Sequence, residues 1–355
     1  MSKDAVHACT RQWYRGDTEL VFRYHLVLGQ PFPCMFHAGT SVLEFPNSRS
    51  IGRKKSRRET AAVQRNLRAR DESTGCERPG VGLALGGGFA RGFAHLGVLK
   101  VLEQNRIPIS HIAGTSVGSI FAAAYASGAP LARILAVSRT IRFRDIARWS
   151  VSRLGLASNH RLGDLIERVF DSKQFEQMKI PLAVVATDLA TGDPAVFRQG
   201  PLVEAIRASC AYPGLFEPIQ IGTRCLADGG LVAPVPTDAA LQLGASIVIG
   251  VSLGTQDGSR TSPKNVFQVV ARAVAAAQKH QLDTWERHAD LVIRPDLQGL
   301  AWDDFDRAGE AIAAGEAAAQ VAVPRIQKLL TLAEHAATVL GDSSLSHHWL
   351  AEALK

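Results

Sequence analysis

Two glycine-rich turns, about thirty residues apart, constrain the fold of this 355-residue chain more than any other feature. The first, GGGFARG at 86–92, follows the apolar run VGLAL and precedes a segment whose apolar residues recur at helical spacing. The second, GTSVG at 114–118, follows ISHIA and precedes a helical segment of small residues. A strand, helix, strand, helix order of this kind requires parallel strands with a right-handed crossover, and predicts an α/β sandwich.

The rest of the chain continues the alternation of strands and helices. Apolar runs of strand length are expected to form further strands at 180–189, 216–222, 245–253 and 289–297. Helices are expected at 266–285 and 303–340, and Pro324 is expected to kink or divide the second. The arginine-rich stretch 140–161 lacks a clear period and is expected to form a connecting flap or short irregular helices.

The pattern of apolar residues changes after Pro79, where apolar runs of strand length begin to alternate with segments of helical period. We therefore expect three parts: a basic, partly disordered leader at 1–79, a main domain at 80–300, and a helical extension at 301–355 that packs on the main domain. An apolar share of 46% and a charged share of 21% are typical of a soluble globular protein with room for a sizeable core.

The basic character of the chain belongs to its leader. Residues 1–80 hold 14 Lys and Arg against 8 Asp and Glu, so they carry +6 of the formal net charge of +7. The densest part, 49–70, has little apolar periodicity and is interpreted as a solvated, poorly ordered linker. A peripheral contact of this segment with anionic lipid headgroups is the alternative. No nucleic-acid partner is expected.

The cysteines and the apolar runs of the sequence indicate the cellular compartment in which the protein is expected. The five cysteines are odd in number and form no C-x-x-C pair, which suggests neither a disulfide framework nor a zinc site. No apolar run reaches the ~18 residues of a membrane span, and charges interrupt every candidate secretory stretch in the first thirty residues. We expect a cytoplasmic protein, with attachment to the inner face of the membrane as an alternative.

The turn GTSVG has the G-x-S-x-G spacing of a nucleophile elbow. In such an elbow a serine, here Ser116, stands on a sharp turn between a strand and a helix, and small neighbours such as Gly114 and Gly118 let the backbone approach closely. The alternative is a plain tight turn before a helix.

The upstream glycine cluster could leave backbone amides bare, as an oxyanion hole requires. Arg91 could fix that loop or attract an anionic headgroup. Two phosphate-binding alternatives fit poorly. The segment lacks the Lys-Ser/Thr ending of a nucleotide P-loop, and Arg91 stands where a dinucleotide fingerprint needs its third glycine.

A serine nucleophile needs a base, and Asp228 in LADGG is the candidate. It follows a short apolar strand and precedes two glycines, although an Asp-Gly turn is the commoner origin of such a pair. His95 and His111 lie closest in sequence to the two turns, but both are expected to be structural. No histidine has a context that compels a triad.

Four segments together resemble the patatin-like phospholipases, specifically the bacterial branch related to the esterase domain of neuropathy target esterase. They are GLALGGGFARGFAHLGVLKVLE, IAGTSVGSI, ASCAYPGLFEP and DGGLVAPVP, and they cover about residues 81–252. The resemblance implies a three-layer sandwich with a mostly parallel sheet and a Ser-Asp dyad without histidine. Carried onto this chain, it assigns the nucleophile Ser116, the base Asp228, the elbow glycines Gly114 and Gly118, the oxyanion loop Gly86, Gly87, Gly88, Arg91 and Gly92, the base motif Gly229 and Gly230, and the substrate-side Pro213.

The function that this resemblance implies is hydrolysis of a lipid or other acyl ester through an acyl-serine intermediate. No cofactor and no metal are expected. A transacylase would use the same residues and differ only in water access. A lipid-binding regulator that keeps the fold without the chemistry is the alternative of another class.

Overall fold

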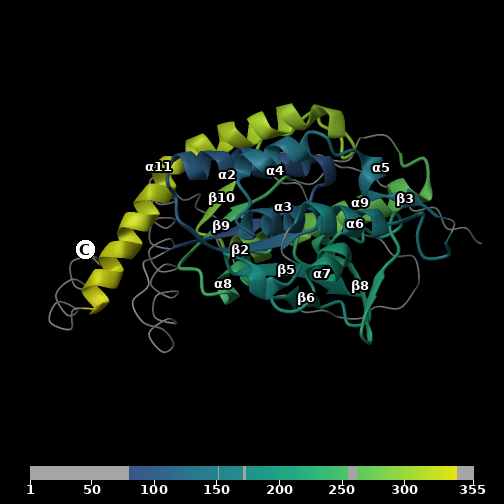
Figure 1. Ribbon diagram of the computed structural model, residues 1–355, viewed down its shortest axis with the longest axis horizontal. Helices are drawn as coiled ribbons and strands as arrows, with labels where there is room; N and C mark the ends of the chain where they lie inside the picture. The colour runs from purple at the N-terminus through teal and green to yellow at the C-terminus, as the bar shows by residue number, and fades with distance from the viewer. Residues whose placement is uncertain (1–79, 151, 171–172, 255–261, 342–355) are drawn as a thin grey trace, which may run out of the picture. The chain divides into compact units, whose positions relative to one another are not determined.

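A computed structural model describes residues 80–150, 152–170, 173–254 and 262–341 (Figure 1). The leader expected at 1–79, with its basic cluster at 49–70, lies outside the described residues, as does the chain beyond 341.

The central sheet has eight strands in the order β10-β9-β1-β2-β5-β8-β7, with β6 paired to β5. The strands β10, β9, β1, β2 and β5 run parallel, whereas β6, β7 and β8 are antiparallel to their neighbours. The expected α/β fold with a mostly parallel sheet is confirmed. The bounds are β1 Val81–Leu85, β2 Ile109–Thr115, β5 Leu182–Asp188, β6 Pro194–Phe197, β7 Ile219–Ile221, β8 Arg224–Asp228, β9 Ile247–Val251 and β10 Leu291–Ile293.

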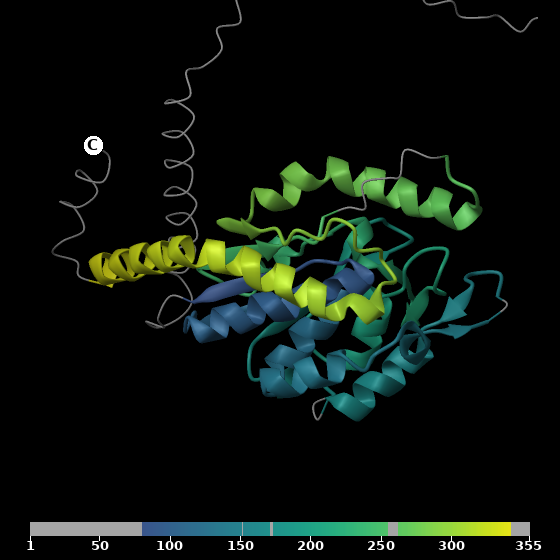
Figure 2. The ribbon, with the colours of Figure 1, turned by 90° about the horizontal axis from the view of Figure 1, so that it is seen from above.

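Helices cover both faces of this sheet. Figure 2 shows α9 on one side, in green, and α2 and α4 on the other, in blue. The α-helices are α2 Ala94–Gln104, α3 Val117–Ala126, α4 Leu131–Ser138, α6 His160–Val169, α7 Leu202–Ser209, α8 Thr237–Gln242, α9 Val266–His280, α10 Leu282–Glu286 and α11 Ala308–Gly341. Within the described ranges there are also four 3-10 turns: η1 Phe89–Phe93, η2 Phe175–Gln177, η3 Gly229–Leu231 and η4 Phe305–Arg307. The helix expected at 266–285 is thus two helices, α9 and α10.

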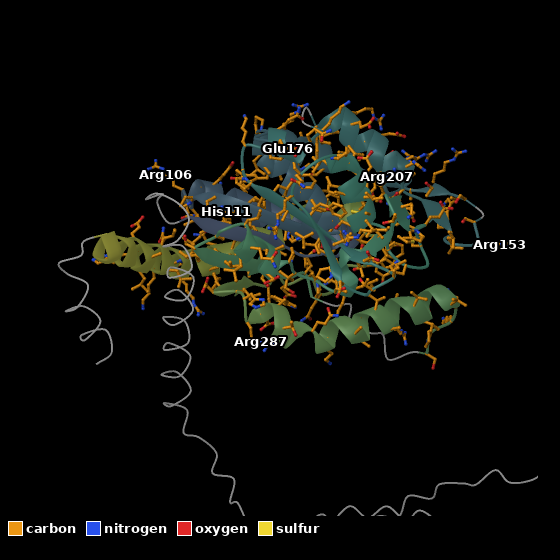
Figure 3. The ribbon with its side chains drawn as sticks, turned by 90° about the horizontal axis from the view of Figure 1, so that it is seen from below. Arg106, His111, Arg153, Glu176, Arg207 and Arg287 are labelled. Carbon is orange, nitrogen blue, oxygen red and sulfur yellow. The ribbon has the colours of Figure 1, made fainter. Side chains whose placement is uncertain are left out.

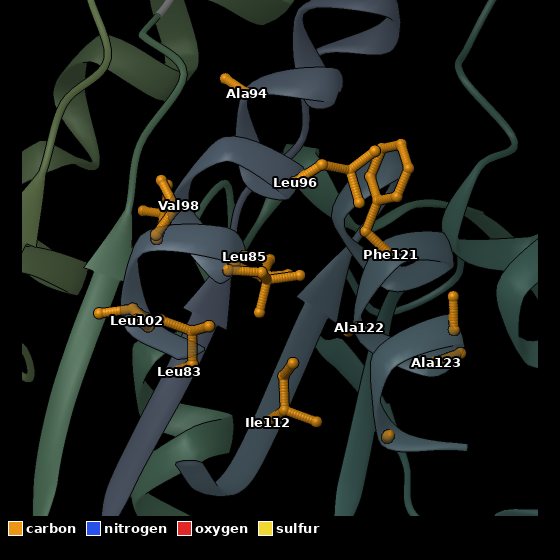
Figure 4. Packing of buried hydrophobic residues seen from close by; sticks show 14 of the residues in the cluster. Leu83, Leu85, Ala94, Leu96, Val98, Leu102, Ile112, Phe121, Ala122 and Ala123 are labelled. Atoms are coloured by element: carbon orange, nitrogen blue, oxygen red, sulfur yellow. The ribbon is translucent and has the colours of Figure 1, made fainter. Parts of the chain in front are cut away.

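The strand β1 shows how the sequence divides the core into two layers. Its large residues Val81, Leu83 and Leu85 alternate with Gly82 and Ala84, and side chains alternate between the two faces of a strand. The large residues join the main core under α2 and α3, where Leu83 and Leu85 lie with residues of both helices (Figure 4). The small residues face α8 and the turn after it, where a Cβ on Gly82 would lie 3.6 Å from the Cβ of Ala240 and 2.3 Å from that of Ala245.

The helix α11 contains Pro324 and is nevertheless one continuous helix, which changes direction partway along in Figure 1. A kink is the expected effect of proline inside a helix. Its first half packs closely on α2, because a Cβ on Gly97 would lie 2.0 Å from the carbonyl oxygen of Ile312, and one on Gly315 would lie 2.0 Å from that of Ala94.

The arginine-rich stretch 140–161 forms the short helix α5 (Phe143–Ile146) and a two-stranded hairpin, β3 (Arg148–Trp149) with β4 (Ala157–Ser158). The expectation of short irregular helices holds for α5 alone, and the β3–β4 hairpin was not predicted. Of the helices in the described ranges, none is long and apolar enough to cross a membrane.

Candidate active site

The register of three neighbouring strands brings Ser116 and Asp228 to the same level of the sheet. Thr115 of β2 pairs with Val185 of β5, and Ala186 pairs with Asp228 at the end of β8. Ser116 directly follows Thr115, so only β5 separates it from Asp228. β8 runs antiparallel to β5, from Leu226 opposite Asp188 to Asp228 opposite Ala186, and this register places its last residue at the level of the carboxyl end of β2.

Ser116 stands at the amino end of α3 in a conformation that few non-glycine residues adopt, with φ 54° and ψ −131°. This is the strained turn expected of a nucleophile elbow. Its two glycines allow the turn: a Cβ on Gly114 would lie 2.4 Å from the Cα of Ser119, and one on Gly118 would lie 2.1 Å from the carbonyl oxygen of Leu85. Neither position has room for a side chain.

Asp228 is 3% exposed, and its two carboxyl oxygens differ. Oδ1 accepts a hydrogen bond of 2.7 Å from the backbone amide of Gly230. Oδ2 is buried and has no regular hydrogen-bond partner among the residues that the structure describes. Burial raises the pKa of this carboxyl to about 6, and hydrogen bonding from Ser116 and Gly230 offsets part of the rise.

The glycine loop after β1 lies against Ser116. A Cβ on Gly87 would lie 3.2 Å from the Cβ of Ser116. The amide of Gly86 donates to the carbonyl of Val251 at 3.1 Å, and that of Gly87 to the carbonyl of Pro234 at 3.2 Å. Within the described part of the chain, the next two amides, of Gly88 and Phe89, donate no hydrogen bond. Among these four amides, those of Gly88 and Phe89 are therefore the ones available to bind an anion.

Arg91 and Gly92 hold this loop in place. The buried guanidinium of Arg91 donates to the carbonyls of Leu253 and Gly254, at the end of β9. A Cβ on Gly92 would lie 2.5 Å from Cγ1 of Val117, so glycine lets η1 approach α3. Of the two roles considered for Arg91, these contacts favour fixing the loop.

The residues after Asp228 support its carboxyl. A Cβ on Gly229 would lie 2.1 Å from the carbonyl oxygen of Val185, so this position must be glycine. Gly230 supplies the amide that holds Oδ1, and its own carbonyl accepts from Nε2 of Gln278 at 2.8 Å. Pro213 is half-buried and stands in the turn before Gly214.

Both histidines lie away from the dyad. His95 is fully buried and donates from Nε2 to the carbonyl of Gly86 at 2.8 Å. Burial lowers its pKa to about 4, so it is neutral at physiological pH. His111 is near the start of β2, while Ser116 follows its end; its Nδ1 lies 2.9 Å from the Ser110 hydroxyl (Figure 3). Across the described ranges, no group of three or more His, Cys, Asp and Glu is arranged to hold a metal.

One residue that supports the elbow was missed in the sequence. The backbone amide of Ser116 donates to the hydroxyl of Ser209 at 2.8 Å, and that hydroxyl donates to the carbonyl of Val185 at 2.6 Å. Ser209 lies in the segment ASCAYPGLFEP, but nothing in that segment indicates which of its polar groups would reach Ser116. The next residue, Cys210, is a buried free cysteine whose pKa is raised by burial.

A parallel α/β sheet with a serine on a strained strand-to-helix turn and a buried carboxyl beside it defines a serine-hydrolase type of site. The model of the patatin-like phospholipase family matches residues 83–241. The chain therefore contains a patatin-like phospholipase domain.

Several known proteins are similar to part of this chain. An NTE family protein of Mycobacterium tuberculosis is 37% identical over 192 residues, which are 53% of this chain and 52% of that protein. Patatin-like phospholipase domain-containing protein 6 of Homo sapiens is 34% identical over 185 residues, 50% of this chain and 14% of that protein. The crystal structure of VipD from Legionella pneumophila has a TM-score of 0.48 at 14% identity and covers 73% of this chain and 67% of that one. The chain spans about half the length, or less, of the relatives it matches.

Proposed function

We propose that this chain hydrolyses acyl esters of lipids, with Ser116 as the nucleophile and Asp228 as its base. The observation that carries the proposal is the Asp228 carboxyl, which is buried next to the Ser116 hydroxyl and whose Oδ2 has no hydrogen bond of regular geometry among the described residues. A buried carboxyl oxygen without a hydrogen-bond partner is costly to keep, so a site that retains one needs an explanation. The explanation is that Oδ2 of Asp228 accepts the proton of the Ser116 hydroxyl.

The raised pKa of Asp228 suits this task. A carboxyl with a pKa of about 6 is mostly ionised at neutral pH, yet it binds a proton more readily than an ordinary aspartate. Serine is a weak nucleophile until a neighbouring base takes its proton. With both histidines engaged elsewhere, Asp228 takes that proton directly, and the Ser116 oxygen forms an ester with the acyl group until water releases it.

Negative charge develops on the substrate carbonyl oxygen during both steps. We propose that the amides of Gly88 and Phe89 stabilise this charge, since the amides of Gly86 and Gly87 already serve backbone carbonyls. One such donor typically contributes ~3 kcal/mol to catalysis. The amino end of α3, which begins beside Ser116, favours the same charge.

The lipid nature of the substrate is supported by two observations. Relatives over this domain carry the names patatin-like phospholipase and lysophospholipase, the latter in Mycosarcoma maydis at 28% identity over 62% of this chain and 12% of that protein. In addition, the loop residue Phe89 lies among aromatic rings, with its centroid 5.2 Å from those of Tyr212 and Trp302. Such an apolar surround is suited to an acyl chain.

Two variants test the dyad. Ser116→Ala and Asp228→Asn should each abolish turnover of a p-nitrophenyl acyl ester and of lysophosphatidylcholine, with circular dichroism unchanged. Ser138→Ala and Asp238→Asn are matched controls, because Ser138 is buried away from the site and Asp238 is an exposed acid on α8. Retention of most activity by either dyad variant would reject the assignment.

A fluorophosphonate probe should label Ser116, and failure to label it would favour a lipid-binding protein without chemistry. Addition of a competing alcohol or lysolipid acceptor separates hydrolysis from acyl transfer. Free fatty acid is the expected product, and predominant transfer to the acceptor would identify a transacylase.

A further inference from the structure

The β3–β4 hairpin exposes an unusual amount of apolar surface. Trp149 is 68% exposed, Leu154 69% and Leu156 52%. Figure 2 shows the hairpin extending from the side of the sheet, in teal. Single exposed apolar side chains are ordinary on protein surfaces, but three within eight residues indicate an interaction surface.

The exposed apolar side chains come from both arms of the hairpin. Trp149 is in β3 and pairs with Ala157 of β4, whereas Leu154 and Leu156 precede β4. The amide of Ser150, next to Trp149, donates to the carbonyl of Leu156 at 3.1 Å, so the two arms are still held together there. A lipid bilayer that the hairpin enters tip first would cover the apolar side chains of both arms.

Positive charge surrounds the same hairpin. The stretch 139–161 contains six arginines and one acidic residue, Asp145. Arg142 pairs with Asp306 at 2.9 Å. The exposed residues Arg144, Arg148 and Arg153 form no ion pair within the part of the chain that the structure describes. Figure 3 shows Arg153 at the outer end of the hairpin.

We propose that the β3–β4 hairpin docks on a bilayer with anionic headgroups, with Trp149, Leu154 and Leu156 entering the interface and the three free arginines binding the headgroups. Tryptophan favours the boundary between acyl chains and headgroups, and each basic residue near an anionic surface adds attraction. This docking goes beyond the chemistry proposed for Ser116 and does not depend on it.

The hairpin is also connected to the candidate active site. The amides of Leu156 and Ala157 donate to the carbonyl of Leu215, at 3.1 and 2.8 Å. That segment continues from Tyr212, whose ring contacts Phe89 of the glycine loop. On the other strand, Trp149 contacts Phe143, and Phe143 contacts Trp302, with ring centroids 6.1 Å apart in both pairs. A bilayer that holds the hairpin therefore lies next to the loop beside Ser116.

The test uses the full chain carrying Ser116→Ala, so that vesicles are not consumed. Co-sedimentation should show stronger binding to vesicles of phosphatidylcholine with phosphatidylglycerol than to phosphatidylcholine alone. Trp149→Ser should weaken binding to the mixed vesicles roughly tenfold, and Arg153→Glu at least about fivefold. The matched controls Val321→Ser and Lys328→Glu, on the exposed side of α11, should change it less than about twofold.

Insertion is measured separately from adsorption with bromine-labelled acyl chains. They should quench part of the tryptophan emission, and Trp149→Phe should bind as well as the parent but lose that part of the quenching. Equal vesicle binding by Trp149→Ser and the parent overturns the proposal. So does unchanged quenching in Trp149→Phe. If sedimentation velocity shows a dimer that Trp149→Ser dissolves, while vesicle binding is unaffected, the surface belongs to a second copy instead.

Discussion

The backbone amide of Ser116 donates to the hydroxyl of Ser209, a residue 93 positions later in the chain, at 2.8 Å. This bond holds the strained elbow from a different helix, since Ser209 ends α7. The hydroxyl is itself fixed by the carbonyl of Val185 on β5. Ser116 is therefore positioned by the same strand that separates it from Asp228.

Ser209→Ala removes both bonds and leaves the Ser116 amide buried without its partner. We expect a loss of about 1–3 kcal/mol in the free energy of unfolding, the cost of an unsatisfied buried donor. Because the elbow loses its support, kcat should fall more than KM changes. Urea denaturation and steady-state kinetics measure the two effects. Ser138→Ala, a buried serine bonded only within its own helix, is the control; equal effects in both would show that Ser209 has no special role.

The activity should depend on pH through Asp228. The base works only when ionised, so kcat/KM should rise about tenfold per unit below a pKa of about 6 and level off above it. His95 would not produce this limb, since its pKa is about 4. An acid limb near pH 4, measured with an uncharged ester, would mean that burial does not raise the pKa of Asp228.

The same shift predicts the stability of Asp228→Asn. The folded pKa of about 6 exceeds the reference value of 3.8, so the folded chain binds more protons between these values and loses stability as pH rises through that window. The loss in the free energy of unfolding approaches about 3 kcal/mol above pH 6, because each unit of pKa difference corresponds to ~1.4 kcal/mol. Asp228→Asn should therefore be more stable than the parent at pH 8 by up to this amount, and similar to it below pH 4. Thermal denaturation at both pH values checks this.

Gly87 tests the contact between the loop and the nucleophile. A methyl group there would lie 3.2 Å from the Cβ of Ser116, which is tighter than ordinary packing. Gly87→Ala should therefore move the loop amides or Ser116 and lower kcat by roughly 10²–10³, the range for loss of an oxyanion donor. Gly309→Ala on α11 meets no atom within 4 Å and should leave kcat unchanged. Parent-like kcat in Gly87→Ala would remove this loop from the mechanism.

His95 should act by positioning the loop rather than by proton transfer. Its Nε2 holds the carbonyl of Gly86, so His95→Gln should retain part of the activity, while His95→Leu should lose more because the carbonyl is left unsatisfied. In both variants the acid limb should stay near pH 6. If the acid limb of the pH profile shifted to another pH in either variant, His95 would take part in proton transfer.

The local elements of the site follow from the sequence. The runs before Gly86 and Ser116 predict strands, and β1 and β2 are there; the small residues after Ser116 predict a helix, and α3 begins at the next residue. The glycines at 114 and 118 predict close backbone approach, and at each of them a Cβ would lie within 2.4 Å of a neighbouring backbone atom. A few neighbouring residues determine each of these features, so the sequence around each one is enough to predict it.

Other features depend on contacts between distant segments. The hydrogen bonds from the amides of Gly86 and Gly87 to the carbonyls of Val251 and Pro234 could not be predicted, because these carbonyls come from segments about 150 residues away. The hairpin at 148–158 was missed because its strands have two residues each, too short for a period to be detected. The role of Ser209 depends on how α7 packs.

The sequence by itself determined that a serine would stand on a glycine-flanked turn between strand and helix, and that an aspartate would end a short strand before two glycines. These outcomes rest on backbone sterics over a few residues. Only the tertiary structure decided that the two side chains lie next to each other, that one carboxyl oxygen has no regular hydrogen bond within the described residues, and that the pKa of Asp228 is raised to about 6. Strand order, register and burial are set by packing the whole chain, and no local pattern contains them.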